Sequence, residues 1–197
     1  MHMLLFDKWD FNGVKVEDPG LVKYINLRPV LVPRTFGRYR GDFRKNNMTI
    51  IERFANKLMV PGHQGKRHKL TSGRMCGNYP TIMREMQIAF GIIEKKTNTN
   101  PVQVLVKAVE NAALYEEIAA YQMGGMIARK AVITSPQRRV DVALRLITQG
   151  IYRSTFGKPK TLHDVIADEL MAIANNDGKA LAIRERSRIE KEAEGAR

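Results

Sequence analysis

Arginines alternate with aromatic residues in the segment 33–45, where Phe36, Tyr39 and Phe43 stand between basic residues and two glycines interrupt the run. Guanidinium groups pair with phosphates in a bidentate manner, and aromatic faces stack on unpaired bases. Glycine lets a backbone come close to a ligand. The chemistry this pattern predicts is the binding of a polyanion, without any bond being made or broken.

A second basic tract covers residues 61–69 and has no apolar periodicity. Short basic tracts of this kind often become ordered only when they bind. Both tracts belong to a block from Arg28 to Arg74 with twelve basic residues and two acids, a formal +10 out of the chain's +13. The rest of the chain is therefore close to neutral.

This charge distribution indicates contact with nucleic acid or an anionic membrane, because a free enzyme gains nothing from such self-repulsion. The alternative is a solvated charge run, the more usual interpretation of an isolated short tract. Two basic loops that flank one helix favour nucleic acid.

A further candidate is the pair Arg138 and Arg139, in the first turn of an expected helix, where the helix macrodipole disfavours cations. A phosphate held by the arginines and the free N–H groups would resolve this conflict. Exposed arginines, or a salt bridge to Glu116 or Glu117, would resolve it equally well. The sequence leaves both interpretations open.

Enzymatic chemistry finds no support in the sequence. His63, His68 and Cys76 do not form a closed four-ligand zinc set. We find no phosphate-loop motif, nucleophile elbow or dinucleotide fingerprint. We therefore expect a protein that is not an enzyme and has no cofactor and no metal.

The compartment can also be predicted. Cys76 is the only cysteine, which suits a reducing compartment, and we expect a cytoplasmic protein. No stretch approaches roughly 18 consecutive apolar residues, and the N-terminus is too short and too acidic for a secretory signal, so no membrane partner is expected.

The elements that must position these residues are mainly α-helices. Apolar spacing and capping signals predict helices at about 49–60, 81–96, from Asn100-Pro101 onward, 136–149, 162–175 and, as a peripheral helix that frays at Gly195, 179–197. Gly124 and Gly125 separate two runs without helical spacing and predict the tip of a β-hairpin at about 117–134. We expect a mainly α protein: an N-terminal extension with a basic arm (1–46), then a single helical domain of about six helices with a protruding hairpin (47–197).

Several motifs occur together in one order. They are the segments 51–63, 100–113, 124–125, 135–145 and 174–177, with the C-terminal Glu194-Gly-Ala-Arg197. In this order and spacing the chain resembles the small-ribosomal-subunit protein seven family, in its archaeal branch, over about residues 21–197. Leu114 stands where proline is usual, so the helix that begins at Pro101 is expected to run slightly further.

The resemblance implies a helical protein with a protruding hairpin that binds the 3′ major (head) domain of small-subunit ribosomal RNA and nucleates head assembly. It places the hairpin tip, Gly124 and Gly125, near exit-site tRNA and the messenger RNA path, with ribosomal proteins of the head and platform as neighbours. Together, charge and resemblance predict these RNA-binding residues: Arg34, Arg38, Arg40, Arg44, Lys45, Lys57, Lys66, Arg67, Lys69, Arg74, Arg129, Lys130, Arg138 and Arg139.

Two rivals come from other classes. A DNA-binding regulator would need the helices at 136–149 and 161–175 to form a recognition pair, but eleven residues separate them, too many for the usual tight turn. An RNA-processing enzyme would need a convergent catalytic site, for which the sequence offers no residues.

Overall fold

The computed structural model describes residues 3–39, 41, 44–62 and 73–197. Within these ranges the chain is mainly α-helical, as predicted, with one two-stranded antiparallel sheet. The elements, in chain order, are the 3-10 helix η1 (Arg44–Asn47), α1 (Ile50–Met59), α2 (Tyr79–Thr97), α3 (Pro101–Ala112), β1 (Glu116–Met123), β2 (Met126–Ile133), α4 (Pro136–Thr155), α5 (Leu162–Ala174) and α6 (Leu181–Glu194).

The helix starts follow from side chains that satisfy the free N–H groups of the first turn. Thr49 accepts a hydrogen bond from the backbone N–H of Glu52, Asn100 from that of Val102, and Thr161 from that of Asp164. Ser135 stands at the start of α4 with extended backbone angles but makes no such bond. At that helix the proline at position 136, with its fixed φ, marks the start without help from the predicted cap.

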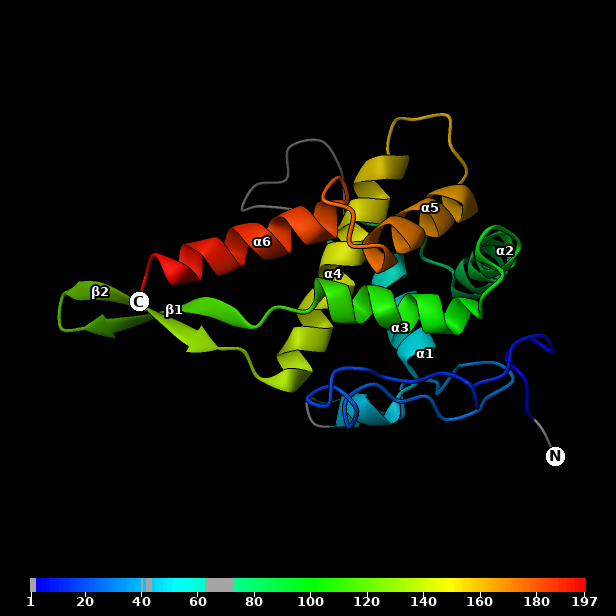
Figure 1. The fold of residues 1–197 in the computed structure, drawn as a ribbon, viewed down its shortest axis with the longest axis horizontal. Coiled ribbons are helices and arrows are strands. Elements are labelled where there is room, and N and C mark those ends of the chain that lie inside the picture. The colour runs from blue at the N-terminus through cyan, green and yellow to red at the C-terminus, as the bar shows by residue number, and fades with distance from the viewer. Residues whose placement is uncertain (1–2, 40, 42–43, 63–72) are drawn as a thin grey trace.

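The core lies where α3, α4 and α5 meet, with α1, α2 and α6 packed around them. The N-terminal segment belongs to the same core, and it runs along the helices in Figure 1. Trp9 is buried edge-on against the ring of Phe90, and its indole N–H donates to Glu94 over 3.1 Å. The boundary that we propose at residue 46 therefore separates sequence features but not packing units.

The hairpin protrudes from one end of the helical body, as Figure 1 shows. Its register pairs Met123 with Met126 and Ala120 with Arg129. Gly124 adopts a positive φ of 58° at the turn, which explains the need for glycine there. The prediction of a hairpin at about 117–134 is confirmed; at its base, β1 begins one residue earlier and β2 ends one residue earlier than predicted.

Three helix predictions need correction. α4 continues to Thr155, past the predicted end at 149, because Gly150 is a buried packing position rather than a stop: a Cβ there would lie 3.5 Å from that of Leu181. α3 ends at Ala112 and does not continue past Leu114, which is buried. The C-terminal helix is not peripheral, since Leu181, Ala182, Ile183 and Ala193 are buried. It does end before Gly195, as predicted.

The longer α4 also shortens the connection to α5 to residues 156–161. The predicted separation of eleven residues was therefore wrong. The connection is still longer than the tight turn of a helix-turn-helix pair. In the parts of the chain that the structure describes, no helix is both long and apolar enough to span a membrane.

Candidate nucleic-acid interface

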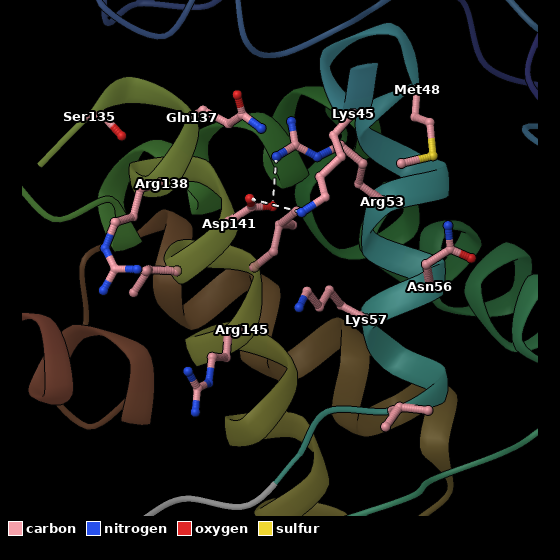
Figure 2. Close-up of a pocket in the computed structure, with 13 residues that line it drawn as sticks. Lys45, Met48, Arg53, Asn56, Lys57, Ser135, Gln137, Arg138, Asp141 and Arg145 are labelled. Atoms are coloured by element: carbon pink, nitrogen blue, oxygen red, sulfur yellow. Dashed lines mark hydrogen bonds and ion pairs between the residues drawn. The ribbon is translucent and has the colours of Figure 1, made fainter. Parts of the chain in front are cut away.

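A groove runs between α1 and α4, with a volume of about 690 Å³ (Figure 2). Lys45, Arg53 and Lys57 line it from the side of η1 and α1, while Arg138 and Arg145 line it from α4. We call this the α1–α4 groove. Its lining contains one acid, Asp141, against five basic side chains, which leaves a formal charge of +4.

Asp141 is already matched by cations on the opposite wall. Arg53 donates to one carboxylate oxygen of Asp141 over 3.0 Å, and the ammonium of Lys45 lies 3.9 Å from the other. Arg53 is buried, and its second donor group reaches the carbonyl of Tyr24 over 2.9 Å. This link joins the two walls of the groove, while Lys57 and Arg145 stay available to a ligand.

Helical spacing explains how the cations converge. Arg53 and Lys57 are four residues apart on α1, and Arg138, Asp141 and Arg145 recur at intervals of three and four on α4, so each set lies on one face. Figure 2 shows Lys57 pointing across the groove toward α4. Among the described residues, no ion-pair partner is found for Lys57 or Arg145.

Arg138 and Arg139 have different environments although they are adjacent. Arg138 is exposed and forms a bidentate pair with Glu117, one of the arrangements that the sequence left open. This hydrogen bonding is the main cause that raises the pKa of the Arg138 guanidinium. Arg139 is only 7% exposed; it donates to the carbonyl of Leu114 over 2.9 Å and to Asp18 over 2.7 Å. Its guanidinium is turned into the protein and does not reach the groove.

A second cavity, of about 480 Å³, adjoins the groove. Lys45, Met48 and Asn56 line both, so the two lie side by side. Three aromatic residues, Phe36, Tyr39 and Tyr79, surround the second cavity together with Arg34. We call it the aromatic cavity.

Tyr79 makes one wall of the aromatic cavity rigid. Its hydroxyl donates to the carbonyl of Pro33, and its ring lies 5.3 Å from the Arg34 guanidinium carbon. Burial raises the pKa of Tyr79 above its usual range, and the negative charge of Glu52 raises it further, while Arg34 opposes the shift. The hydroxyl therefore stays protonated as a donor.

The structure brings some of the predicted RNA-binding residues together and not others. Lys45, Lys57 and Arg138 share the groove, and Arg34 lies in the aromatic cavity. Arg38, Arg44 and Arg74 are exposed outside both, and Arg129 and Lys130 are exposed on β2. Arg40, Lys66, Arg67 and Lys69 lie outside the described residues, as do His63 and His68.

Arg53 and Arg145 were not among the predicted site residues. The signal that could have found them was present: each is four or seven residues from a predicted cation on the same helix face. Counting charges along the sequence identifies a basic block, but only the helical period shows which cations face one another across two helices.

The hairpin offers a different kind of surface. Its outer half exposes large apolar side chains, with Met123 at 62%, Met126 at 77% and Ile127 at 73%. Its base is fastened to the body: one guanidinium nitrogen of Arg197 donates to both carboxylate oxygens of Glu116, over 2.6 and 2.7 Å, and Ala131 donates its N–H to the carbonyl of Ala196. The base is held while the tip is left open on both faces.

A helical body with a cationic groove, an adjoining aromatic cavity and a projecting hairpin is the arrangement expected of a structural RNA-binding protein. The model of one family, described as Ribosomal protein S7p/S5e, matches residues 21–197. The chain is 45% identical over 198 residues to the small ribosomal subunit protein uS7 of Nanoarchaeum equitans, covering all of both chains. It is 41% identical to the proteins of the same name from Cenarchaeum symbiosum (all of this chain, 98% of the relative) and Methanothermobacter thermautotrophicus (98% of each).

The chain therefore belongs to the ribosomal protein S7p/S5e family, in agreement with the resemblance found in its sequence motifs. Family membership makes it a structural ribosomal protein of the small subunit and not an enzyme. Its place is the ribosome in the cytoplasm, and its partners are ribosomal RNA and other ribosomal proteins.

Proposed function

We propose that this protein binds the 3′ major (head) domain of small-subunit ribosomal RNA and nucleates assembly of the subunit head. The observation that carries the proposal is the α1–α4 groove, where five cations meet a single acid that two of them already neutralise. A groove of this charge built on two packed helices suits an RNA backbone, because phosphates supply affinity while shape sets the position.

The hairpin, in this proposal, extends from the anchored body toward exit-site tRNA and the messenger RNA path. The fastened base and the open tip support this role. Met126 and Ile127, beside Gly124 and Gly125, are exposed and do not pack within the chain itself. Exposed apolar groups of this size commonly mark contact surfaces. Neighbouring head and platform proteins are the other proposed contacts.

Head-domain RNA binding at several salt concentrations tests the proposal. We expect Lys57→Ala combined with Arg145→Ala to weaken binding and to flatten the log–log salt dependence by roughly 1.4–1.8, which corresponds to two lost phosphate contacts. Lys95→Ala with Lys107→Ala, two exposed lysines on α2 and α3 outside the groove, gives a control of equal charge.

An unchanged affinity and slope in the groove variant would remove the groove from the interface. Competition with duplex DNA distinguishes the remaining rival, a DNA-binding regulator. If duplex DNA displaced the head-domain RNA at equal concentration, the proposed RNA specificity would be wrong.

A further inference from the structure

The side chain of Glu52, in the first turn of α1, does not make the local capping hydrogen bond that its position in the sequence predicts. Thr49 and Glu52 have the spacing of a capping box, in which the glutamate would turn back to the N–H of the cap residue. Thr49 does accept from the N–H of Glu52, but the Glu52 side chain leaves the helix and one of its oxygens accepts from both the N–H and the hydroxyl of Thr35, over 2.9 and 2.7 Å. The carboxyl group is thereby held at the aromatic cavity, which it helps to line.

The other carboxyl oxygen of Glu52, Oε2, is the unexplained feature. The side chain is 3% exposed, and this oxygen has no hydrogen-bond partner among the described residues. A buried carboxyl oxygen without a donor is unfavourable, and such an atom in a native protein points to a missing partner. That partner must bring an N–H or O–H group to this oxygen, beside the cavity that Glu52 lines.

The outer wall of the same cavity offers a stacking surface. Phe36 is 82% exposed although it is a large apolar residue, and its backbone has a positive φ of 50°, which is rare for such a residue. The Arg34 guanidinium lies 4.4 Å from the centre of the Phe36 ring. This contact covers part of the ring and leaves the rest exposed, and stacking on a flat ligand would cover it.

The position of the aromatic cavity beside the α1–α4 groove restricts the kinds of ligand that the cavity can bind. Because Lys45, Met48 and Asn56 line both spaces, a ligand can have its anionic part in the cationic groove and its flat part beside Phe36. A nucleotide has this division: a phosphate at one end and, in adenine, cytosine and guanine, a planar ring with an exocyclic amino donor at the other.

We propose that the aromatic cavity captures one unpaired, amino-bearing base of the bound RNA, which stacks on Phe36 and donates its amino group to Glu52. The inference rests on the proposed RNA-binding function and adds a sequence-reading contact to it. The groove then positions the strand by its phosphates, while Glu52 selects the base.

The test is chemical probing of the Watson–Crick edges of unpaired bases in the head-domain RNA, with dimethyl sulfate and kethoxal, free and bound to the full chain. Wild type is expected to protect at least one unpaired adenine, cytosine or guanine in a manner that depends on Phe36 and Glu52. Phe36→Ala should remove this protection and weaken binding about tenfold, the size of one lost base–aromatic stack. Glu52→Gln should also remove it, because the amide presents a donor or leaves only one acceptor where the carboxylate presents two.

Two controls keep the result decisive. Phe36→Tyr preserves the ring and should keep the protection, and Val32→Ala removes an exposed apolar group of the same segment that does not line the cavity. If Glu52→Gln unfolds the protein, the result for Phe36→Ala is sufficient to test the proposal. The Phe36 ring is so exposed that it contributes little to the stability of the fold.

Failure of the two hypotheses can be told apart. If wild type forms no complex with the RNA, the proposed function is wrong and this inference falls with it. If the complex forms and its footprint is the same in wild type, Phe36→Ala and Glu52→Gln, the base-binding inference alone is overturned. That second outcome would assign the cavity to a protein neighbour or to the chain itself.

Discussion

The α1–α4 groove and the β-hairpin are both exposed and both carry basic residues, but they are built in opposite ways. The groove stands on two helices that pack against the core, and an ion pair between the buried Arg53 and the partly exposed Asp141 joins its walls. The hairpin has two strands with no other sheet partner among the described residues, and its outer half is exposed. The groove presents cations, whereas the hairpin tip presents apolar side chains.

The difference implies two kinds of contact. A groove with unpaired cations binds by neutralising phosphates, and its affinity must fall as salt rises. An arm with an apolar tip gains contact by reaching a partner and burying surface, which responds weakly to salt. The joint between them is the short stretch at the start of α4, where Arg138 faces outward and Arg139 faces inward.

The largest expected effect lies at that joint. Arg139→Ala removes the buried cation that links Asp18 of the N-terminal segment to the carbonyl of Leu114 next to the hairpin. We expect a loss of about 3 kcal/mol in the free energy of unfolding, because Asp18 keeps its charge without a cation beside it. Arg138→Ala, one residue earlier and exposed, should cost less than about 1 kcal/mol. Urea unfolding of both variants measures the contrast, and equal losses would refute the distinction between the two arginines.

The next largest effect is expected in the basic arm, where RNA binding depends on charge. Replacing Arg38, Arg40 and Arg44 of the basic arm with alanine should weaken head-domain RNA binding and reduce the log–log salt slope by roughly 2–3, for three lost phosphate contacts. Binding titrations at several salt concentrations measure this. A slope equal to that of wild type would take the arm out of the interface and leave the groove alone.

A smaller effect concerns the cavity beside the groove. Since the pKa of Tyr79 is raised in the folded protein, the folded state keeps a proton that the unfolded chain loses above about pH 10, and stability must fall as pH rises beyond that point. Tyr79→Phe should make this decline shallower, while costing about 1 kcal/mol at neutral pH for the lost bond to Pro33. The free energy of unfolding, measured from pH 7 to 11.5 for wild type and Tyr79→Phe, tests this prediction. Tyr121→Phe, at an exposed position of the hairpin, is the control.

The smallest effect is expected at the hairpin tip. Met126→Ser combined with Ile127→Ser should leave head-domain RNA affinity within about twofold of wild type and the salt slope unchanged, because these exposed side chains carry no charge and no packing. Lys57→Ala in the groove, by contrast, should lower the slope by roughly 0.7–0.9. A large loss of head-domain affinity in the tip variant would mean that the two regions share one RNA surface.

Local patterns in the sequence predicted most of the fold. Helix periods, the proline that follows Asn100 and the paired glycines at 124–125 each depend on a few neighbouring residues, so these elements were placed to within a few residues. The errors came from contacts between distant segments. Gly150 looks like a helix end until α6 crosses over it, and Leu114 leaves the helix to give its carbonyl to Arg139.

The sequence predicted the kind of ligand that the candidate site binds, but not how the residues of the site are arranged. Charge clustering pointed to nucleic acid, yet it could not show that Lys57 and Arg145, far apart in the chain, line the same groove. Nor could it separate Arg138 from Arg139, because a buried arginine and an exposed one look alike in sequence. Glu52 shows the same limit: its spacing from Thr49 is that of a local capping partner, whereas Thr35 from a distant segment holds the carboxyl group.

The central claim, that the groove carries ribosomal RNA while the hairpin tip lies elsewhere, is tested most directly by photo-crosslinking within assembled small subunits. A crosslinker at Asn56, which lines both groove and cavity, is compared with one at Met126 and one at Lys95 on α2. We predict that position 56 crosslinks to head-domain RNA, that position 126 crosslinks to tRNA, messenger RNA or a protein neighbour, and that position 95 gives no head-domain product from the same nucleotides. If position 56 gave no RNA crosslink while position 126 reached the head domain, the account would be contradicted.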